Sequence, residues 1–291
     1  MGRIKFKKLR HGPIFRKVAM GSWKTAKDPS VYAFVEIDMQ KTLDLLPDYS
    51  SKHQVKITPS HLVGRAMTYA MQRRPEINGM IRFWKIYLRS SVDLFFQVNI
   101  PGKEDKTKGA NLAGTVVRSS QALTLADLSK KLSAQANLMK NGDMGDLKTS
   151  FSVFKFIPWA LMGLFLDLTS LLIYGLNLNL TFLGFPKDPF GSVMITNTGG
   201  LGVERVLAPL IPYTRVPLLI TVGALTDRAV VIDKKVEVRP CITLGVTFDH
   251  RLMDGVHAAK MAEDLKFCFE NPNEVLFNDS LDLSSHRKDY L

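Results

Sequence analysis

A strand-like run gives way to a helix-like run near the C-terminus, and a histidine stands between the two. Residues 241–248 alternate in the manner of a β-strand, and residues 256–270 have the pattern of a helix. Rigid backbone on both sides would hold His250 at this junction while its ring faces a cleft. An imidazole can take up and return a proton near neutral pH. The junction therefore predicts an α/β fold with a candidate acid–base group at the end of a strand.

Strands and helices are interspersed along the rest of the chain. The patterns predict strands at residues 30–39, 92–100, 115–117, 191–196, 218–223, 229–233 and 236–239, the last two as a hairpin around Lys234 and Lys235. They predict helices at residues 59–73, capped by Ser60, and at 124–140, capped by Thr124 with Asp127 three residues on. No repeat or low-complexity linker interrupts them. We expect one domain, residues 1–291, with a mixed β-sheet and packed helices.

The charge balance is strongly basic and begins with an N-terminal arm, residues 1–17, that holds seven Arg or Lys. The net charge of +12 fits a solvated arm, a contact with anionic lipid, or attraction of a polyanion such as coenzyme A. No zinc-ligand spacing, RNA-binding aromatic motif or basic helix-turn-helix accompanies the charge, so no nucleic-acid partner is expected. Cys241 and Cys268 lie in apolar runs, which is typical of buried, reduced thiols in a cytoplasmic protein.

Residues 156–185 form an apolar insertion with Asp167 as their one charge. A membrane span needs about 20 apolar residues, and an ionised carboxylate at mid-bilayer is costly. Polar residues also recur at helical steps, as Asp167, Ser170, Tyr174, Asn177 and Thr181. The pattern predicts a helix that ends near Gly175 and a strand after it. Three environments stay open: a membrane interface, burial in the protein or a subunit contact, and a true span.

The residues around His250 suggest how such a site would be built. Asp254 can cap the following helix and can also hold the turn through a buried ion pair with an arginine. Gly255 would let the backbone turn without a Cβ clash. Asp249 and Arg251 point away from His250, and we expect structural roles for them. We interpret the segment around His250 as the base of a coenzyme A-dependent acyl transfer, a reaction that also needs a donor for the oxyanion. Thr196 or Thr198, on one side of a strand, would serve, and spacing does not separate them.

These motifs resemble the catalytic domain of the dihydrolipoamide acyltransferases of 2-oxoacid dehydrogenase complexes, which share a fold with chloramphenicol acetyltransferase. Residues 249–255 are similar to that family's Asp-His-Arg-x-x-Asp-Gly motif, and residues 191–200 resemble its oxyanion strand, with Thr196 at the hydroxyl position. Residues 216–224 resemble the strand between the two. Weaker similarity extends through residues 16–19, 58–78 and 114–128, so the resemblance covers most of the chain outside the insertion.

The resemblance implies a trimeric α/β protein with active sites between subunits. His250 of one subunit would act as general base on the acceptor, and Thr196 of its neighbour would donate to the oxyanion. Asp254 would be the third site residue, with Arg16 as its partner. Acyl-coenzyme A would be the substrate, and no metal and no lipoyl group on this chain would be needed.

Two departures from the family pattern leave several functions open. The sequence shows no lipoyl-lysine motif, lipoyl domain or subunit-binding domain, and the insertion has no counterpart. We expect a free-standing acyltransferase with a small-molecule, lipid or lipoyl acceptor, cytoplasmic or peripheral on the inner face of the membrane. The alternatives are an acyltransferase core that works in trans on lipoyl domains, an antibiotic acetyltransferase, and a non-catalytic structural or membrane scaffold. Peptide-synthetase condensation domains need two lobes and a second histidine, where this chain has Asp249.

Overall fold

A mixed β-sheet forms the centre of the protein. The computed structural model describes residues 28–83, 85–100, 111–140, 157–183, 185 and 187–283. The expected basic arm 1–17, which includes Arg16, lies outside the described residues. The sheet has seven strands in the order β1-β9-β7-β6-β4-β5, and β8 pairs with β9. β6 runs parallel to β4 and β7, whereas the remaining neighbours are antiparallel.

The elements have the following bounds. The sheet strands are β1 (Ser30–Asp38), β4 (Leu94–Ile100), β5 (Asn111–Val117), β6 (Val193–Asn197), β7 (Leu218–Val222), β8 (Thr226–Ile232) and β9 (Lys235–Asp249). The strands β2 (Gly79–Arg82) and β3 (Lys85–Leu88) form a separate hairpin. The helices are α2 (Gln40–His53), α3 (Pro59–Arg73), α4 (Leu125–Lys140), α6 (Trp159–Ser170) and α7 (Gly255–Glu270). The expected α/β class with a mixed sheet and packed helices is confirmed.

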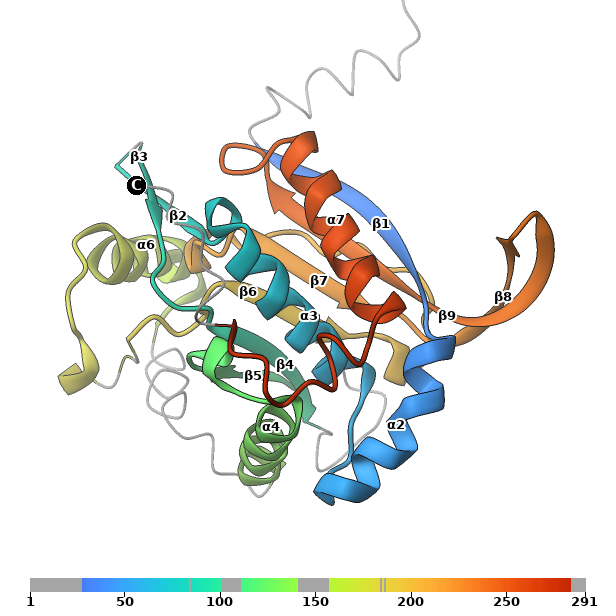
Figure 1. Cartoon of the computed structure of the whole chain (residues 1–291). Coiled ribbons are helices and arrows are strands. Elements are labelled where there is room, and N and C mark those ends of the chain that lie inside the picture. The colour runs from blue at the N-terminus through green and yellow to red at the C-terminus, as the bar shows by residue number, and fades with distance from the viewer. Residues whose placement is uncertain are drawn as a thin grey trace, which may run out of the picture.

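Helices α3 and α7 cover one face of the sheet (Figure 1). All but two of the fifteen residues of α3 are buried, because the helix packs on the sheet and also contacts α7 and α4. Its buried residues include polar ones, among them Arg65, which donates to the Leu123 carbonyl at 2.6 Å. Helix α7 contributes Met261, Leu265 and Phe269 to the same core. Cys241 and Cys268 are buried and free of disulfides, as expected.

Of the two predicted helix caps, the one before α4 is confirmed and the one at α3 is wrong. The Thr124 hydroxyl accepts from the Asp127 main-chain N–H at 3.1 Å and donates to the Asp127 carboxylate, which confirms that cap. Helix α3, by contrast, is capped by Thr58, whose main-chain N–H donates to His61 Nδ1 at 3.0 Å. The expected cap Ser60 was wrong. Ser60 lies inside the first turn of the helix and accepts a hydrogen bond from Asn197 on β6.

Three elements differ from the sequence prediction. Helix α2 forms although Pro47 lies inside it, and the β2–β3 hairpin had no prediction. The two strands expected at 236–239 and 241–248 are one continuous strand, β9. The hairpin before it is confirmed, and its turn at Asp233 and Lys234 has positive φ angles of 49° and 65°, which suit the twist of paired strands.

The insertion contains one short helix. Helix α6 continues into a π-helical turn, Leu171–Gly175, which confirms the predicted end at Gly175. The strand expected next is absent from the described residues 176–183, which contain a short 3-10 helix, Thr181–Leu183. Among the described residues, no helix is both long and apolar enough to cross a bilayer. At the end of α6, Ser170 is buried and accepts from Arg215 Nε at 3.0 Å.

Candidate active site

His250 lies directly after β9, in a turn held by the ends of two neighbouring strands. Its main-chain N–H donates to the Pro29 carbonyl at 2.9 Å, and the N–H of Asp249 donates to the Pro217 carbonyl at 2.9 Å. These bonds tie the turn to the start of β1 and to the start of β7. The residue itself is exposed. The sheet therefore fixes the backbone of His250 and leaves its imidazole open to a ligand or a neighbouring subunit.

The residues on either side of His250 pair with each other. Arg251 Nη2 donates to Asp249 at 2.6 Å, and the Arg251 main-chain N–H donates to the same carboxylate at 2.9 Å. The Asp249 carboxylate raises the pKa of Arg251 through these contacts. Both side chains line a cavity of about 770 Å³, together with Asp167 and Ser170 of the insertion. The expected structural role of Asp249 and Arg251 agrees with this pairing.

Asp254 caps helix α7, as the sequence predicts. One of its carboxylate oxygens accepts from the main-chain N–H groups of Val256 and His257, each at 3.0 Å, and lies 2.6 Å from His257 Nδ1. The hydrogen bonds from His257 hold the pKa of Asp254 below its usual range. The Asp254 side chain is 54% exposed in the single chain. Its expected partner Arg16 lies outside the described residues.

The clash argument for Gly255 is not supported by the geometry. A Cβ added at Gly255 would meet no heavy atom within 4 Å, and its φ is not positive. Gly255 is the first residue of α7, where any residue can adopt the helical conformation. The turn after His250 does not depend on a glycine at this position in the single chain.

The structure separates the two candidate oxyanion donors. Thr198 donates its hydroxyl proton to the Val222 carbonyl of β7 at 3.2 Å. Thr196 lies at the C-terminal end of β6, is partly exposed, and has no hydrogen-bond partner for its hydroxyl among the described residues. A free hydroxyl can donate to a developing negative charge, whereas one already bonded within the sheet must first give up its partner. Thr196 is therefore the better candidate.

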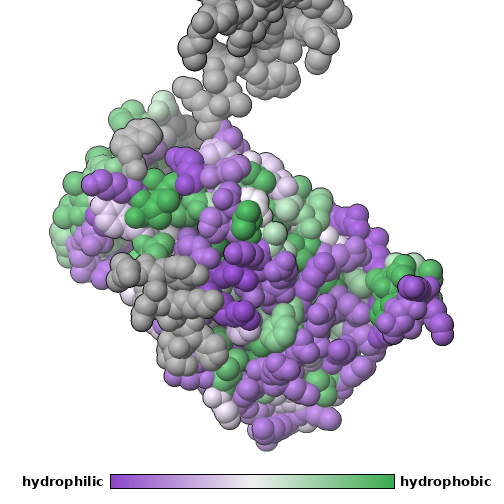
Figure 2. Space-filling view, turned by 45° about the horizontal axis from the view of Figure 1, so that its top comes forward, coloured by the Kyte–Doolittle hydropathy of each residue, from purple (hydrophilic) through white to green (hydrophobic). Residues whose placement is uncertain are grey.

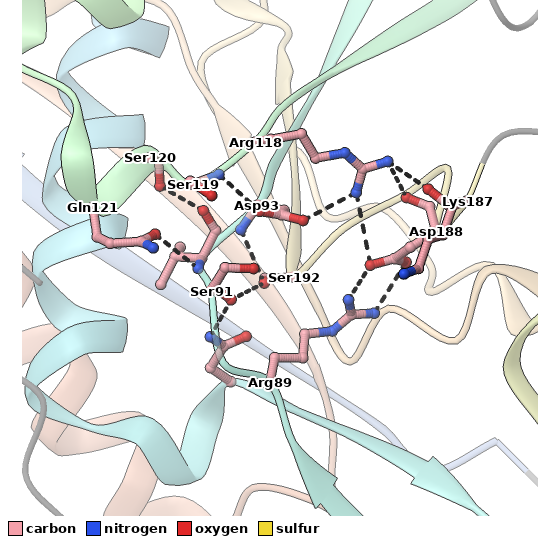
Figure 3. A network of polar contacts seen from close by, with 12 residues as sticks. Arg89, Ser91, Asp93, Arg118, Ser119, Ser120, Gln121, Lys187, Asp188 and Ser192 are labelled. Carbon is pink, nitrogen blue, oxygen red and sulfur yellow. Dashed lines mark hydrogen bonds and ion pairs between the residues drawn. The ribbon is translucent and has the colours of Figure 1, made fainter. Parts of the chain in front are cut away.

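A network of two arginines and two aspartates fastens the chain just before β6 (Figure 3). Arg118 donates to the Asp93 carboxylate at 3.0 Å and to the main-chain oxygens of Lys187 and Asp188 at 2.6 and 2.7 Å. Arg89 forms an ion pair with Asp188. The network joins the end of the insertion to the strands β4 and β5. No sequence motif predicted it, because its members come from three separate segments.

Gly191 brings the backbone close to this network. Its φ is +64°, and a Cβ there would lie 2.5 Å from the main-chain oxygen of Asp93. The next main-chain N–H, of Ser192, donates to that same oxygen at 2.7 Å. Only glycine accommodates both the positive φ and the close approach. The start of β6, and with it the position of Thr196, is set by this contact.

His250 and Thr196 do not meet within one chain. Thr196 pairs with Thr221, Thr221 pairs with Gly245, and His250 lies five residues beyond Gly245 on β9. At about 3.3 Å per residue, the two positions are about 17 Å apart along the strands, and they are also about 10 Å apart across the sheet. The expected site between subunits agrees with this separation. Among the described residues, no group of three His, Cys, Asp or Glu could hold a metal ion.

Comparisons with known proteins find the same family that the motifs resemble. The family model of the 2-oxoacid dehydrogenases acyltransferase catalytic domain matches residues 9–151 and 190–277. The unmatched stretch between them contains the whole insertion. The dihydrolipoyllysine-residue succinyltransferase component of the 2-oxoglutarate dehydrogenase complex of Rickettsia typhi is 25% identical over 249 residues, 84% of this chain and 50% of the relative. The mitochondrial component of Bos taurus is 22% identical over 251 residues, 84% of this chain and 44% of the relative. The chain spans about half the length of the curated relatives it matches.

Solved structures share the fold. The cubic core of the pyruvate dehydrogenase multienzyme complex is 15% identical, with a TM-score of 0.65 over 94% of both chains. The dihydrolipoamide acetyltransferase of Azotobacter vinelandii is 14% identical, with a TM-score of 0.63 over 94% of both chains, and its structural study addresses a serine, a histidine and an asparagine in the catalytic mechanism.

Proposed function

Because the chain belongs to the family of 2-oxoacid dehydrogenase acyltransferase catalytic domains, we propose that it transfers an acyl group between coenzyme A and a thiol or hydroxyl acceptor. His250 is the general base and Thr196 the oxyanion donor. The observation that carries the proposal is the placement of His250, with its backbone held by β1 and β7 and its ring exposed beyond the end of the sheet. The curated relatives are dihydrolipoyllysine-residue succinyltransferases, which supports acyl transfer by this chain.

The proposed reaction runs without a covalent acyl-enzyme. The imidazole of His250 takes the proton from the acceptor thiol or hydroxyl, whose sulfur or oxygen then attacks the thioester carbonyl carbon. The carbonyl oxygen becomes an oxyanion that accepts a hydrogen bond from the Thr196 hydroxyl. Collapse of this intermediate breaks the carbon–sulfur bond to coenzyme A, and the imidazolium returns its proton to the leaving thiolate. Binding both substrates in one channel supplies the proximity that the transfer needs.

The site is completed by a second copy of the chain, which we propose to be part of a homotrimer or a multiple of trimers. The separation of His250 and Thr196 supports this, since neither residue can reach the other within one subunit. The β8–β9 hairpin extends from the body of the molecule (Figure 1) and exposes Val231, Val236 and Val238 on it. Exposed apolar side chains on a projecting hairpin favour a subunit contact.

Asp254 holds the proposed site in place. It fixes the start of α7 directly after the His250 turn, and Arg16 is its proposed partner in an ion pair. In the Azotobacter acetyltransferase the asparagine follows the histidine by four residues, which is the spacing of His250 and Asp254 here. An amide and a carboxylate both accept hydrogen bonds from a helix N-terminus.

Two versions of this function differ in the acceptor that receives the acyl group. The curated relatives are dihydrolipoyllysine-residue succinyltransferases, which favours a dihydrolipoyl thiol carried by another chain. The insertion beside the His250 turn, where Asp167 and Asp249 line one cavity, favours a different acyl group or acceptor. Both versions use the same residues and the same proton transfers.

The test is a screen for release of coenzyme A. Acyl-coenzyme A substrates of rising chain length are offered with dihydrolipoamide and with hydroxyl acceptors. We expect His250→Ala to lower turnover by about 10²–10⁴-fold, the usual share of general acid–base catalysis. The matched control is His257→Gln, which removes a neighbouring imidazole and supplies glutamine at the third helix position, where it supports the cap. Equal turnover in His250→Ala and the unaltered protein would remove the proposed mechanism, and no turnover of any substrate by the unaltered protein would leave the scaffold function.

A further inference from the structure

Helix α6 turns its apolar side away from the protein. Leu161, Leu164 and Leu168 recur at steps of three and four and are 52%, 69% and 50% exposed. Further along the segment Ser170 and Tyr174 are buried, whereas Asp167 is exposed and lines the cavity. A helix on the surface of a soluble protein turns its apolar stripe toward the core and polar residues outward, whereas α6 has leucines on its outer side as well. The outward side of α6 therefore needs a partner.

This side continues onto a neighbouring element. Arg82 of the β2–β3 hairpin donates to the Gly175 carbonyl at 2.9 Å, which joins the hairpin to the π-helical turn that follows α6. The hairpin exposes Phe83, Ile86 and Tyr87, and the insertion exposes Phe182 beyond α6. Of the 23 large apolar side chains exposed among the described residues, eleven lie in residues 83–88 and 161–182. We call this surface the apolar face; Figure 2 shows hydrophobic side chains gathered on the same side of the molecule.

The charges around the apolar face indicate what it binds. Lys85 and Lys187 are exposed beside it, and the Arg82 guanidinium lies 4.9 Å from the centre of the Tyr87 ring. The one acid of the insertion, Asp167, is exposed and lines the cavity shared with the His250 turn. An apolar surface with basic side chains at its edge fits an anionic bilayer, in which leucines enter the acyl boundary and lysines meet the headgroups. A tyrosine at this edge is also typical of the membrane interface.

The length of α6 decides how it would meet the bilayer. Twelve residues of helix extend about 18 Å, whereas the hydrocarbon core is about 30 Å thick. The helix is therefore suited to lie in the interface plane rather than to cross it. The segment also falls between the two stretches that the family model matches, so it is an addition to the acyltransferase core.

We propose that the apolar face docks the protein on an anionic phospholipid bilayer, with α6 in the plane of the interface. This inference goes beyond the proposed acyl transfer, because the residues involved are not those of the candidate active site. It gives a structural basis to the peripheral location expected from the sequence. Docking of this kind would bring the His250 turn, which shares a cavity with α6, close to a lipid surface.

The experiment is co-sedimentation of the full chain with vesicles of phosphatidylcholine alone or with added phosphatidylglycerol. The altered protein is Leu164→Glu, and the matched control is Leu138→Glu, an exposed leucine of α4 away from the apolar face. We expect binding to the anionic vesicles that weakens with salt. Leu164→Glu should lower the partition coefficient by about tenfold or more, because a charge replaces a leucine in the acyl boundary. Leu138→Glu should change it less than twofold.

Two outcomes would overturn the proposal. The first is an unaltered protein that sediments with neither kind of vesicle. The second is a Leu164→Glu protein that binds vesicles as before and has a smaller oligomeric mass, which would assign the apolar face to a contact between copies. Melting temperatures of both variants check that the fold is intact. Transfer to a soluble acceptor should be equal in all three proteins, which keeps this test separate from that of the proposed function.

Discussion

Thr196 and His250 lie at opposite ends of one sheet, two strands apart and displaced by five residues along β9. Both residues are accessible, and neither finds the other within its own chain. A rotationally symmetric assembly in which one end of a sheet meets the other end of the next would bring them together. Each complete site would then need His250 from one subunit and Thr196 from its neighbour.

Mixed assemblies test this arrangement directly. His250→Ala and Thr196→Ala subunits should each be nearly inactive alone. When the two are coexpressed or unfolded and refolded together, about a quarter of the sites should receive both intact residues if subunits mix at random in a ring. Activity should therefore rise to about that fraction of the unaltered protein's turnover. If the mixture stays as inactive as its components while mass measurement shows mixed oligomers, the site is not shared between subunits.

The two threonines of the oxyanion strand should differ in their effects on rate. Thr196→Ala should lower kcat by about 10²–10³-fold, the loss seen when one oxyanion donor is removed. Thr196→Ser should keep most of the activity, since it retains the hydroxyl. Thr198→Ala removes a hydrogen bond to Val222 and should act on stability more than on kcat. A larger loss of kcat in Thr198→Ala than in Thr196→Ala would make Thr198, rather than Thr196, the oxyanion donor.

The regular elements were predictable where local pattern and tertiary structure agree. The strands that end beside His250 and Thr196 have continuous apolar or alternating patterns, and the Asp254 cap follows from a local preference. The patterns do not predict helix α2, and they predict strand β9 as two strands, because each element contains a proline. Pro240 lies where β9 changes from β8 to β1 as its partner, and a proline is tolerated at such a position because a ladder bond ends there.

The sequence predicts the residues of the candidate site better than it predicts the hydrogen bonds and ion pairs that hold them in place. Nothing in the local sequence distinguishes Thr196 from Thr198, because the difference is a bond from Thr198 to another strand. The Arg118–Asp93 and Arg89–Asp188 pairs join residues 25 and 99 positions apart, which no local pattern encodes. Gly255 was assigned from its place in the motif, although the space around it holds a Cβ.

The two glycines near the site should respond differently to substitution. Gly255→Ala should leave the melting temperature nearly unchanged, because its Cβ meets open space at the start of a helix. Gly191→Ala should lower the melting temperature, because it combines a positive φ with a 2.5 Å approach to Asp93. It should also lower kcat by displacing β6. Loss of trimers in Gly255→Ala would show that a neighbouring subunit packs against this residue, and the glycine would then be needed for assembly.

The role of Asp254 can be divided between its cap and its charge. Asp254→Asn keeps a good N-cap and should keep the melting temperature, whereas Asp254→Ala should lower it. If Arg16 is the partner of the carboxylate, Asp254→Asn and Arg16→Met should each lower kcat. The double variant should then lose no more than one of them, since residues in one ion pair are not additive. Additive losses would show that Arg16 and Asp254 do not act through one ion pair.

His61 should make the stability of the protein depend on pH. The residue is 4% exposed, its Nδ1 accepts from the Thr58 N–H, and burial lowers its pKa to about 4. An unfolded chain binds a proton at His61 below its ordinary pKa of about 6.5, whereas the folded chain does so only below about 4. Stability is therefore lost as the pH falls from about 6.5 toward 4, by about 2 kcal/mol at pH 5. His61→Gln retains an acceptor for the helix cap and has no proton to take up, so urea unfolding at pH 7 and pH 5 should show a smaller loss for this variant. An equal loss in both proteins would mean that His61 is not the group responsible.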